Sequence, residues 1–388
     1  MKRNLQIADS INAKRYLQTS RNKQRTVFEG TGSKQISTNF KITTLFGKPV
    51  LPAPRKLDLS DHGLNDDLSE FFVLLEALLE SNKHIYISFK DTVIVRLPMF
   101  LMIVAIQDKY DAKISIIWSK ESPYVNWLIQ DAGSFLSAVK RREAMYDLDV
   151  PRIPVISGSN EEFDELSEAL VDAIRDKYYD GEIPPNIESR ISQAIVETLE
   201  NVGRHAYPNE SLDSNKKWWL ICSIGHNHAS KQDRYMYLAI YDRGRGIPLS
   251  FEDSQVFQHR VKKYYPKEYR ELVLGEDSEA NKVGAVRGLL RSMKSYVKPL
   301  RDTIGDSGLI YASMMHDITR INDANHGQGS VSIKDVVTED PDSCLLIFSN
   351  KGCYQYNKGS DEEHSRYEYK NELSGTLLQW SINLDELY

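Results

Sequence analysis

Cysteine is scarce in this sequence, and its few copies show no paired spacing. Only Cys222, Cys344 and Cys353 occur among the 388 residues. A set this small and odd in number argues against a disulfide framework and against a zinc site. We therefore expect stability to come from a hydrophobic core, which a chain of this length can build without covalent staples.

Long hydrophobic runs are also missing. The longest, from Leu97 to Ile106, is far shorter than the ~20 residues that span a bilayer. The first 25 residues alternate charged and polar side chains and lack the apolar core of a signal peptide. Both absences predict a cytoplasmic protein that does not enter a membrane.

A net positive charge is missing as well. The 49 Lys and Arg against 55 Asp and Glu leave a charge of −6, which excludes a globally basic nucleic-acid binder. Residues 1–56 nevertheless carry twelve Lys and Arg against only Asp9 and Glu29, a local charge of +10. One interpretation is a basic arm that binds nucleic acid or an acidic partner. The other is a tail that is solvated or packs on an acidic neighbour.

The order of predicted elements divides the chain. We expect a basic, partly irregular arm over 1–49, an α/β domain over 50–148, a linker over 149–159 and an α+β sandwich over 160–388. In the α/β domain, strands at 84–89 and 113–118 alternate with helices at 68–79, 97–106 and 123–131. In the sandwich, helices at about 160–178 and 187–206 precede strands at 218–224, 235–241, 344–348 and 375–382.

The helix that ends near residue 206 carries a polar ridge beside its apolar face. Glu197, Asn201 and Arg204 follow one another at helical spacing. Carboxylate and amide oxygens suit Mg²⁺, and arginine suits phosphate. The alternative is a solvated polar face.

Three further segments carry candidate binding groups. Asp242 ends an apolar strand just before Gly244 and Gly246, where its carboxylate could accept a hydrogen bond from an exocyclic amine. As an alternative, this segment is an ordinary turn. The second segment is a glycine pair, Gly327 and Gly329 with Ser330, which opens a predicted helix and suits phosphate. The third is Gly375 with Thr376, which opens the last strand.

In this order, the four segments resemble the motifs of the GHKL ATPase superfamily (gyrase, Hsp90, histidine kinase, MutL) over about residues 160–388. The resemblance implies a Bergerat-type α/β sandwich that binds ATP and Mg²⁺. The matching residues are Glu197 and Asn201 (N-box), Asp242, Gly244 and Gly246 (G1 box), Gly327 and Gly329 (G2 box), and Gly375 and Thr376.

The resemblance also implies roles for these residues. Asp242 would bind the adenine amino group, assisted through water by Thr376, and Asn201 would hold Mg²⁺ against the phosphates. Glu197 stands where hydrolysing members place a general base. We expect Arg204 and His205 on the phosphate side, with packing as the alternative for His205.

The sequence departs from the family pattern around the G2 box. Ser330 follows Gly329 where leucine is common, and Gly284 to Gly288 is a competing candidate. We prefer 327–329 because a predicted strand follows it at the family's distance. The segment 249–326 is then a lid too long for a loop, so we expect it to form helices and to offer a surface to a second copy or a protein partner.

The domain over 50–148 resembles a STAS domain in its pattern of elements. Where anti-sigma antagonists carry a serine, this sequence has Asp91 and Thr92, which makes Thr92 a candidate for phosphorylation. A plain scaffold is the alternative. The resulting hypotheses are an ATP-binding, Mg²⁺-dependent regulatory ATPase, a serine/threonine kinase that acts on a STAS-type domain, and a non-enzymatic module for nucleic acid or protein with a structural nucleotide.

Overall fold

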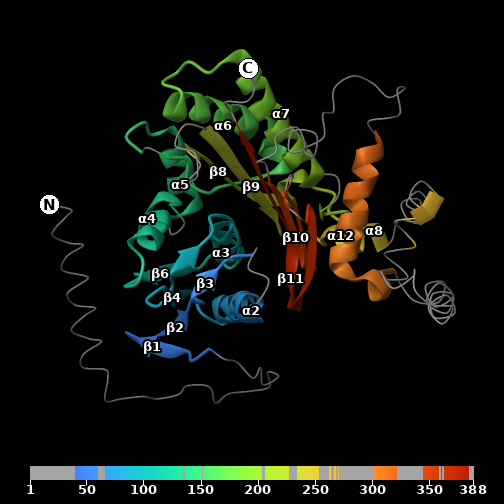
Figure 1. Cartoon of the computed structure of the whole chain (residues 1–388). Coiled ribbons are helices and arrows are strands. Elements are labelled where there is room, and N and C mark those ends of the chain that lie inside the picture. Colours follow the sequence, from blue (N-terminus) through green and yellow to red (C-terminus); the bar gives the residue numbers. More distant parts are fainter. Residues whose placement is uncertain are drawn as a thin grey trace.

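The residues that the computed structural model describes form a mixed α/β fold with three sheets, as the element pattern predicted (Figure 1). The described residues are 40–59, 66–133, 136–150, 152–202, 206–226, 234–252, 262–263, 266–267, 270, 300–320, 344–357, 360 and 362–383. Most of the basic arm therefore lies outside them.

The N-terminal unit (described residues between 40 and 133) is built on a four-stranded sheet in the order β1-β2-β4-β6. Strands β2, β4 and β6 are parallel, and helices α2 and α3 connect them. Strands β3 and β5 form a separate short parallel pair, and α4 follows β6. The bounds are β1 Thr43–Leu45, β2 Lys48–Pro52, β3 Lys56–Leu57, α2 Asp66–Ser81, β4 His84–Ser88, β5 Ile94–Val95, α3 Pro98–Lys109, β6 Lys113–Ile117 and α4 Pro123–Asp131.

The C-terminal unit (described residues between 152 and 383) is built on an antiparallel sheet of five strands in the order β10-β11-β9-β8-β7. Helix α5 (Ala138–Tyr146) joins the two units. The remaining bounds are β7 Ile156–Ser159, α6 Phe163–Tyr178, α7 Pro185–Asn201, β8 Lys217–His226, β9 Arg234–Asp242, α8 Ile247–Glu252, α12 Leu300–Arg320, β10 Cys344–Asn357 and β11 His364–Asn383, with 3₁₀ turns at Asn160–Glu162 and Asp213–Asn215.

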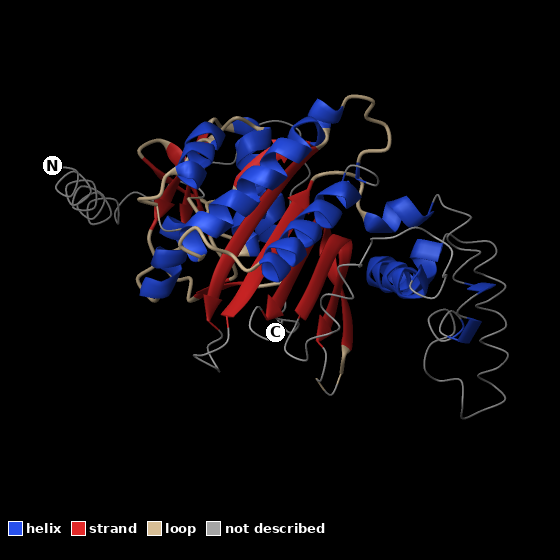
Figure 2. Ribbon diagram, turned by 90° about the horizontal axis from the view of Figure 1, so that it is seen from above, coloured by secondary structure: helices blue, strands red, loops and turns tan. Residues whose placement is uncertain are grey.

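Helices cover one face of this sheet, as Figure 2 shows. Alternate side chains of a strand share a face, so Trp218, Leu220 and Cys222 of β8 point into one core with Leu238 and Ile240 of β9. Helices α6, α7 and α12 supply the other side of that core, including the buried positions Ile191, Ile195, Leu199 and Ile310.

The N-terminal unit covers the opposite face. Trp219 of β8 and Tyr241 of β9 belong to the same hydrophobic core as Phe71 of α2 and Ile103 of α3. Because α3 lies between the two sheets, every residue from Pro98 to Gln107 is buried, which explains why its sequence is apolar on all sides. The two units therefore share one core.

The segment expected as a linker, 149–159, contains part of the sheet. Residues 156–159 form β7, which pairs antiparallel with β8 at the edge. The strand is short and contains Gly158, where a Cβ atom would lie 2.6 Å from the Trp218 ring. The prolines and the glycine of this segment are typical of a linker, but close packing against Trp218 requires the glycine.

No described helix combines the length and the hydropathy needed to cross a membrane. All three cysteines have free thiols, which agrees with their unpaired spacing, and Cys222 and Cys353 are buried.

Candidate functional site

Asp242 lies at the end of β9 with only 5% of its surface exposed. Strand alternation places it on the helix-covered face, in line with Ile240 and Leu238. Its carboxylate accepts hydrogen bonds from the backbone N–H groups of Gly244, at 2.8 Å, and Thr376. Among the described residues, no cationic side chain pairs with it. Burial raises the pKa of Asp242 to about 7, although the two N–H groups act in the opposite direction.

Two hydroxyl groups lie level with Asp242 on the neighbouring strands. Thr376 of β11 is its register partner, and Ser349 of β10 is the register partner of Thr376. The Ser349 Oγ atom lies 3.1 Å from the Thr376 Oγ1 atom, donates to the Gly375 carbonyl at 3.0 Å and accepts from the Ile247 N–H at 2.9 Å. Three strands thus bring a carboxylate and two hydroxyls together where β9 ends, part-way along the β10–β11 hairpin.

The glycines beside Asp242 are required by contacts with protein backbone or buried side chains. A Cβ atom on Gly244 would lie 2.2 Å from the Ala206 carbonyl oxygen. Gly246 has φ +86° and faces the Asn350 amide, and Gly375 has φ +92° with its Cβ position 1.9 Å from the Asp242 carbonyl oxygen. These positions explain the glycines without a ligand.

The turn after β9 also contacts the segment that follows α7. The Arg245 N–H donates to the Ala206 carbonyl at 2.9 Å. Glu197 and Asn201 lie one turn apart on α7, and the structure describes their backbone but not their side chains. Arg204 and His205 lie outside the described residues.

The expected glycine pair for phosphate, Gly327 and Gly329 with Ser330, lies outside the described residues, as does the competing segment 284–288. Among the described helices, α12 is the last one before β10 in the chain, and it is interrupted at Gly305 (φ +72°). The Ser307 N–H donates to Glu368 of β11 at 2.6 Å.

Part of the expected lid, 249–326, belongs to the sandwich. Helix α12 packs on β10, and its residues Leu309, Ile310 and Met314 are buried. An apolar helix face and a sheet face bury each other, so this portion is structural. Length alone indicated helices here, but it did not indicate where they pack.

Sequence reasoning missed Ser349 and Asn350. Asn350 has φ +57° at a register shift of the β10–β11 hairpin, and its amide donates to the Arg245 carbonyl at 3.3 Å. The available signal was the abrupt change from an apolar run to Ser-Asn at the end of the predicted strand.

The residue after Asp242 points toward the N-terminal unit. The Arg243 guanidinium pairs with the Glu76 carboxylate of α2 at 2.6 Å, and its side chain is only 9% exposed. Glu76 also accepts from Lys109 at 2.7 Å and from the Tyr110 hydroxyl at 3.1 Å. Burial alone would raise the pKa of Glu76, but Lys109, Arg243 and Tyr110 together hold it below its usual value.

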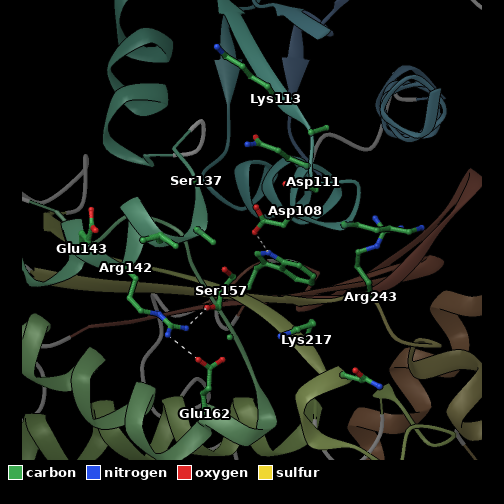
Figure 3. A pocket seen from close by; sticks show the side chains of 18 of the residues that line it. Asp108, Asp111, Lys113, Ser137, Arg142, Glu143, Ser157, Glu162, Lys217 and Arg243 are labelled. Carbon is green, nitrogen blue, oxygen red and sulfur yellow. Dashed lines mark hydrogen bonds and ion pairs between the residues drawn. The ribbon is translucent and has the colours of Figure 1, made fainter. Parts of the chain in front are cut away.

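A cleft of about 1400 Å³ lies between the units, and Arg243 lines one end of it (Figure 3). Asp108, at its centre, accepts from the Trp219 indole at 2.8 Å and from Arg141 at 2.6 Å. Arg142 pairs with Glu162 at 3.0 Å along another wall. The charged groups of both signs in its lining do not indicate one ligand class. In the described residues, no cluster of three or more His, Cys, Asp or Glu could hold a metal ion.

Thr92, the candidate phosphorylation site, is fully buried. Its hydroxyl donates to the Pro54 carbonyl at 2.9 Å. This geometry gives Thr92 a structural role between two loops.

Comparison with known proteins finds no matching family model and no matching curated protein.

Proposed function

We propose that the C-terminal unit binds ATP and Mg²⁺ beside Asp242 and hydrolyses the nucleotide slowly as a regulatory ATPase of the GHKL type. The observation that carries this proposal is the buried Asp242 carboxylate, which has no cationic partner among the described residues. Two carboxylate oxygens offer about four acceptor sites, and the described donors are two backbone N–H groups.

The groups around Asp242 suit the edge of an adenine ring. The carboxylate would accept a hydrogen bond from the exocyclic amine, and the Thr376 hydroxyl would hold a water molecule between itself and the ring. Ser349 orients Thr376 through the 3.1 Å contact between their hydroxyl oxygens. A buried acceptor discriminates strongly against a base that lacks the donor, because the acceptor sites that the two backbone N–H groups leave open would then stay unsatisfied.

The phosphate end of the proposed site depends on α7. The contact between Arg245 and Ala206 joins the turn after Asp242 to the chain that continues from this helix. Asn201 would bind Mg²⁺, which, when bound, neutralises charge on the phosphates. Glu197 would take the proton of the attacking water.

The architecture of the two units is compatible with the two families that the sequence resembles. An antiparallel sheet with helices on one face is compatible with a Bergerat-type sandwich, and parallel strands joined by helices are compatible with a STAS-like unit. Phosphotransfer onto Thr92 is disfavoured, because its hydroxyl is buried and already hydrogen-bonded.

Calorimetric titration with ATP in the presence of Mg²⁺ tests the proposal. We expect the wild type to bind, Asp242→Asn to lose binding, and Glu197→Ala to bind but no longer release phosphate. Asp91→Asn is the matched control because that aspartate is exposed and distant in sequence from the site. Unchanged binding by Asp242→Asn would remove the adenine assignment, and hydrolysis by Glu197→Ala would remove the general base.

A further inference from the structure

The chain on both sides of Asp242 is held by the N-terminal unit. Tyr241 is 1% exposed and lies in the core that β9 shares with α2 and α3. Its hydroxyl donates to the Ser374 carbonyl at 2.7 Å. Arg243, on the other side, reaches Glu76 of α2. Asp242 itself points to the opposite face of the sheet, so its neighbours and its carboxylate contact different layers.

The contact with Glu76 restrains the turn that follows β9. Arg243 is fixed at two points, since its guanidinium pairs with Glu76 and its backbone N–H donates to the Tyr207 hydroxyl at 3.0 Å. Tyr207 in turn donates to the Lys217 carbonyl at 2.6 Å. Charge-assisted hydrogen bonds are roughly twice as strong as neutral ones, so Glu76 is the strongest of these attachments.

Strand β11 is anchored to α2 and to the chain before this helix. Ser69 of α2 accepts from the Asn371 amide of β11 at 3.0 Å. The Tyr369 hydroxyl of β11 donates to the Leu59 carbonyl at 2.9 Å. Glu76 therefore extends from a helix that is fixed relative to β11, and β11 carries Thr376 opposite Asp242.

We propose that Glu76 is a positioning residue for the Asp242 site: through Arg243, the docked N-terminal unit sets the geometry of the turn and thereby the affinity for nucleotide. This inference rests on the proposed function for its ligand. Because coupling between two equilibria is reciprocal, nucleotide bound beside Asp242 would also strengthen the docking of the N-terminal unit. The cleft beside Arg243 exposes one side of this junction to solvent.

The test compares three variants of the full chain. Glu76→Gln keeps the shape of the side chain and removes its charge. Glu80→Gln removes an exposed charge one turn further along α2 and is the matched control. Lys109→Met removes another partner of Glu76 while leaving the pair with Arg243.

Two readouts are measured on each variant: ATP affinity by calorimetry, and hydrogen exchange of the segment 242–247 without nucleotide. We expect Glu76→Gln to weaken ATP binding about five- to tenfold and to speed exchange in this segment, because a neutral amide holds Arg243 less strongly. Glu80→Gln and Lys109→Met should stay within about twofold of the wild type. Thermal unfolding confirms that each variant is folded, and Arg243→Gln repeats the test from the other side of the pair.

The readouts separate two kinds of failure. If the wild type binds ATP and Glu76→Gln matches it in both readouts, the positioning role is overturned while the proposed function stands. If the wild type does not bind ATP, the proposed function fails. Exchange then decides the positioning role alone: faster exchange in Glu76→Gln than in Glu80→Gln supports it, and equal exchange overturns it.

Discussion

Replacing Asp242 with asparagine tests the central feature of the site through stability, without any ligand. In the folded protein, burial raises the pKa of this carboxyl from 3.8 to about 7. The folded state therefore binds the proton more tightly than the unfolded state does. The resulting contribution to the free energy of unfolding is fully present below pH 3.8 and is lost as the pH rises through about 7. Asparagine does not titrate and cannot show this loss.

The size of the effect follows from the shift. Each unit of pKa corresponds to about 1.4 kcal/mol, so a shift of about three units corresponds to a change on the order of 4 kcal/mol. The free energy of unfolding of Asp242→Asn, minus that of the wild type, should increase by this amount from about pH 4 to pH 8. Any loss of stability from the asparagine side chain that does not depend on pH is the same at both pH values, so it cancels in this comparison.

Urea unfolding at several pH values measures the difference. Asp91→Asn serves as the control, because it makes the same replacement at an exposed side chain. Parallel pH profiles for the wild type and Asp242→Asn would refute the reasoning, because they would mean that the carboxyl titrates alike in the folded and unfolded states. The same pKa also predicts that ATP affinity falls below about pH 7, where the protonated carboxyl is a poorer acceptor.

Three further predictions concern the framework of the site. Gly375→Ala should destabilise the protein by at least about 2 kcal/mol in urea unfolding, because φ is +92° and the new Cβ atom would lie 1.9 Å from the Asp242 carbonyl oxygen. Gly47→Ala is its control, since φ is +72° there but no atom lies within 4 Å; an equal cost at both positions would contradict the role of the contact. Arg141→Met should cost on the order of 3 kcal/mol, because the fully buried guanidinium joins Asp108 to the Leu136 and Val155 carbonyls, and a change below about 1 kcal/mol would argue against this network. Cys222 and Cys353 should react with a thiol reagent at pH 7 only after unfolding, because burial raises the pKa of both thiols to about 12; mass spectrometry of the labelled native protein checks this, and modification of either would be inconsistent with the packing.

Most elements could be predicted from local pattern. The amphipathic spacing of Ile191, Ile195 and Leu199 indicated α7, and apolar runs indicated β4, β6, β8 and β9. The short strands β1, β3, β5 and β7 were missed because two to four residues hold too little pattern, and β2 was missed because its two prolines are atypical of a strand. The hairpin of β10 and β11 is much longer than predicted, since its outer half is rich in polar residues and is stabilised by pairing and by contacts such as Tyr369 with Leu59.

The candidate site could be predicted only in part. Asp242 and Thr376 were identified from sequence, and the structure places them in register on adjacent strands. Their glycines were assigned to the G1 box and to the Gly-Thr strand of the family pattern, and the structure shows that close contacts with backbone or buried side chains require them. Ser349 and Arg243 were not anticipated, because the contacts that place them, with Gly375 and with Glu76, join residues 26 and 167 positions apart along the chain.

Residues 1–39 of the basic arm lie outside the described part. A partner for the arm therefore stays a prediction that rests on its charge alone. Local composition and periodicity determined the class of the fold, the order of most of its longer helices and strands, and the position of a carboxylate at the end of a buried strand. They could do so because those properties depend on neighbouring residues. Tertiary structure decided that the N-terminal unit covers the second face of the sheet and that α12 belongs to the sandwich. It also decided that Glu76 reaches the residue after Asp242. These features depend on pairings between distant segments, and the burial of apolar surface that selects them exists only once the whole chain has folded.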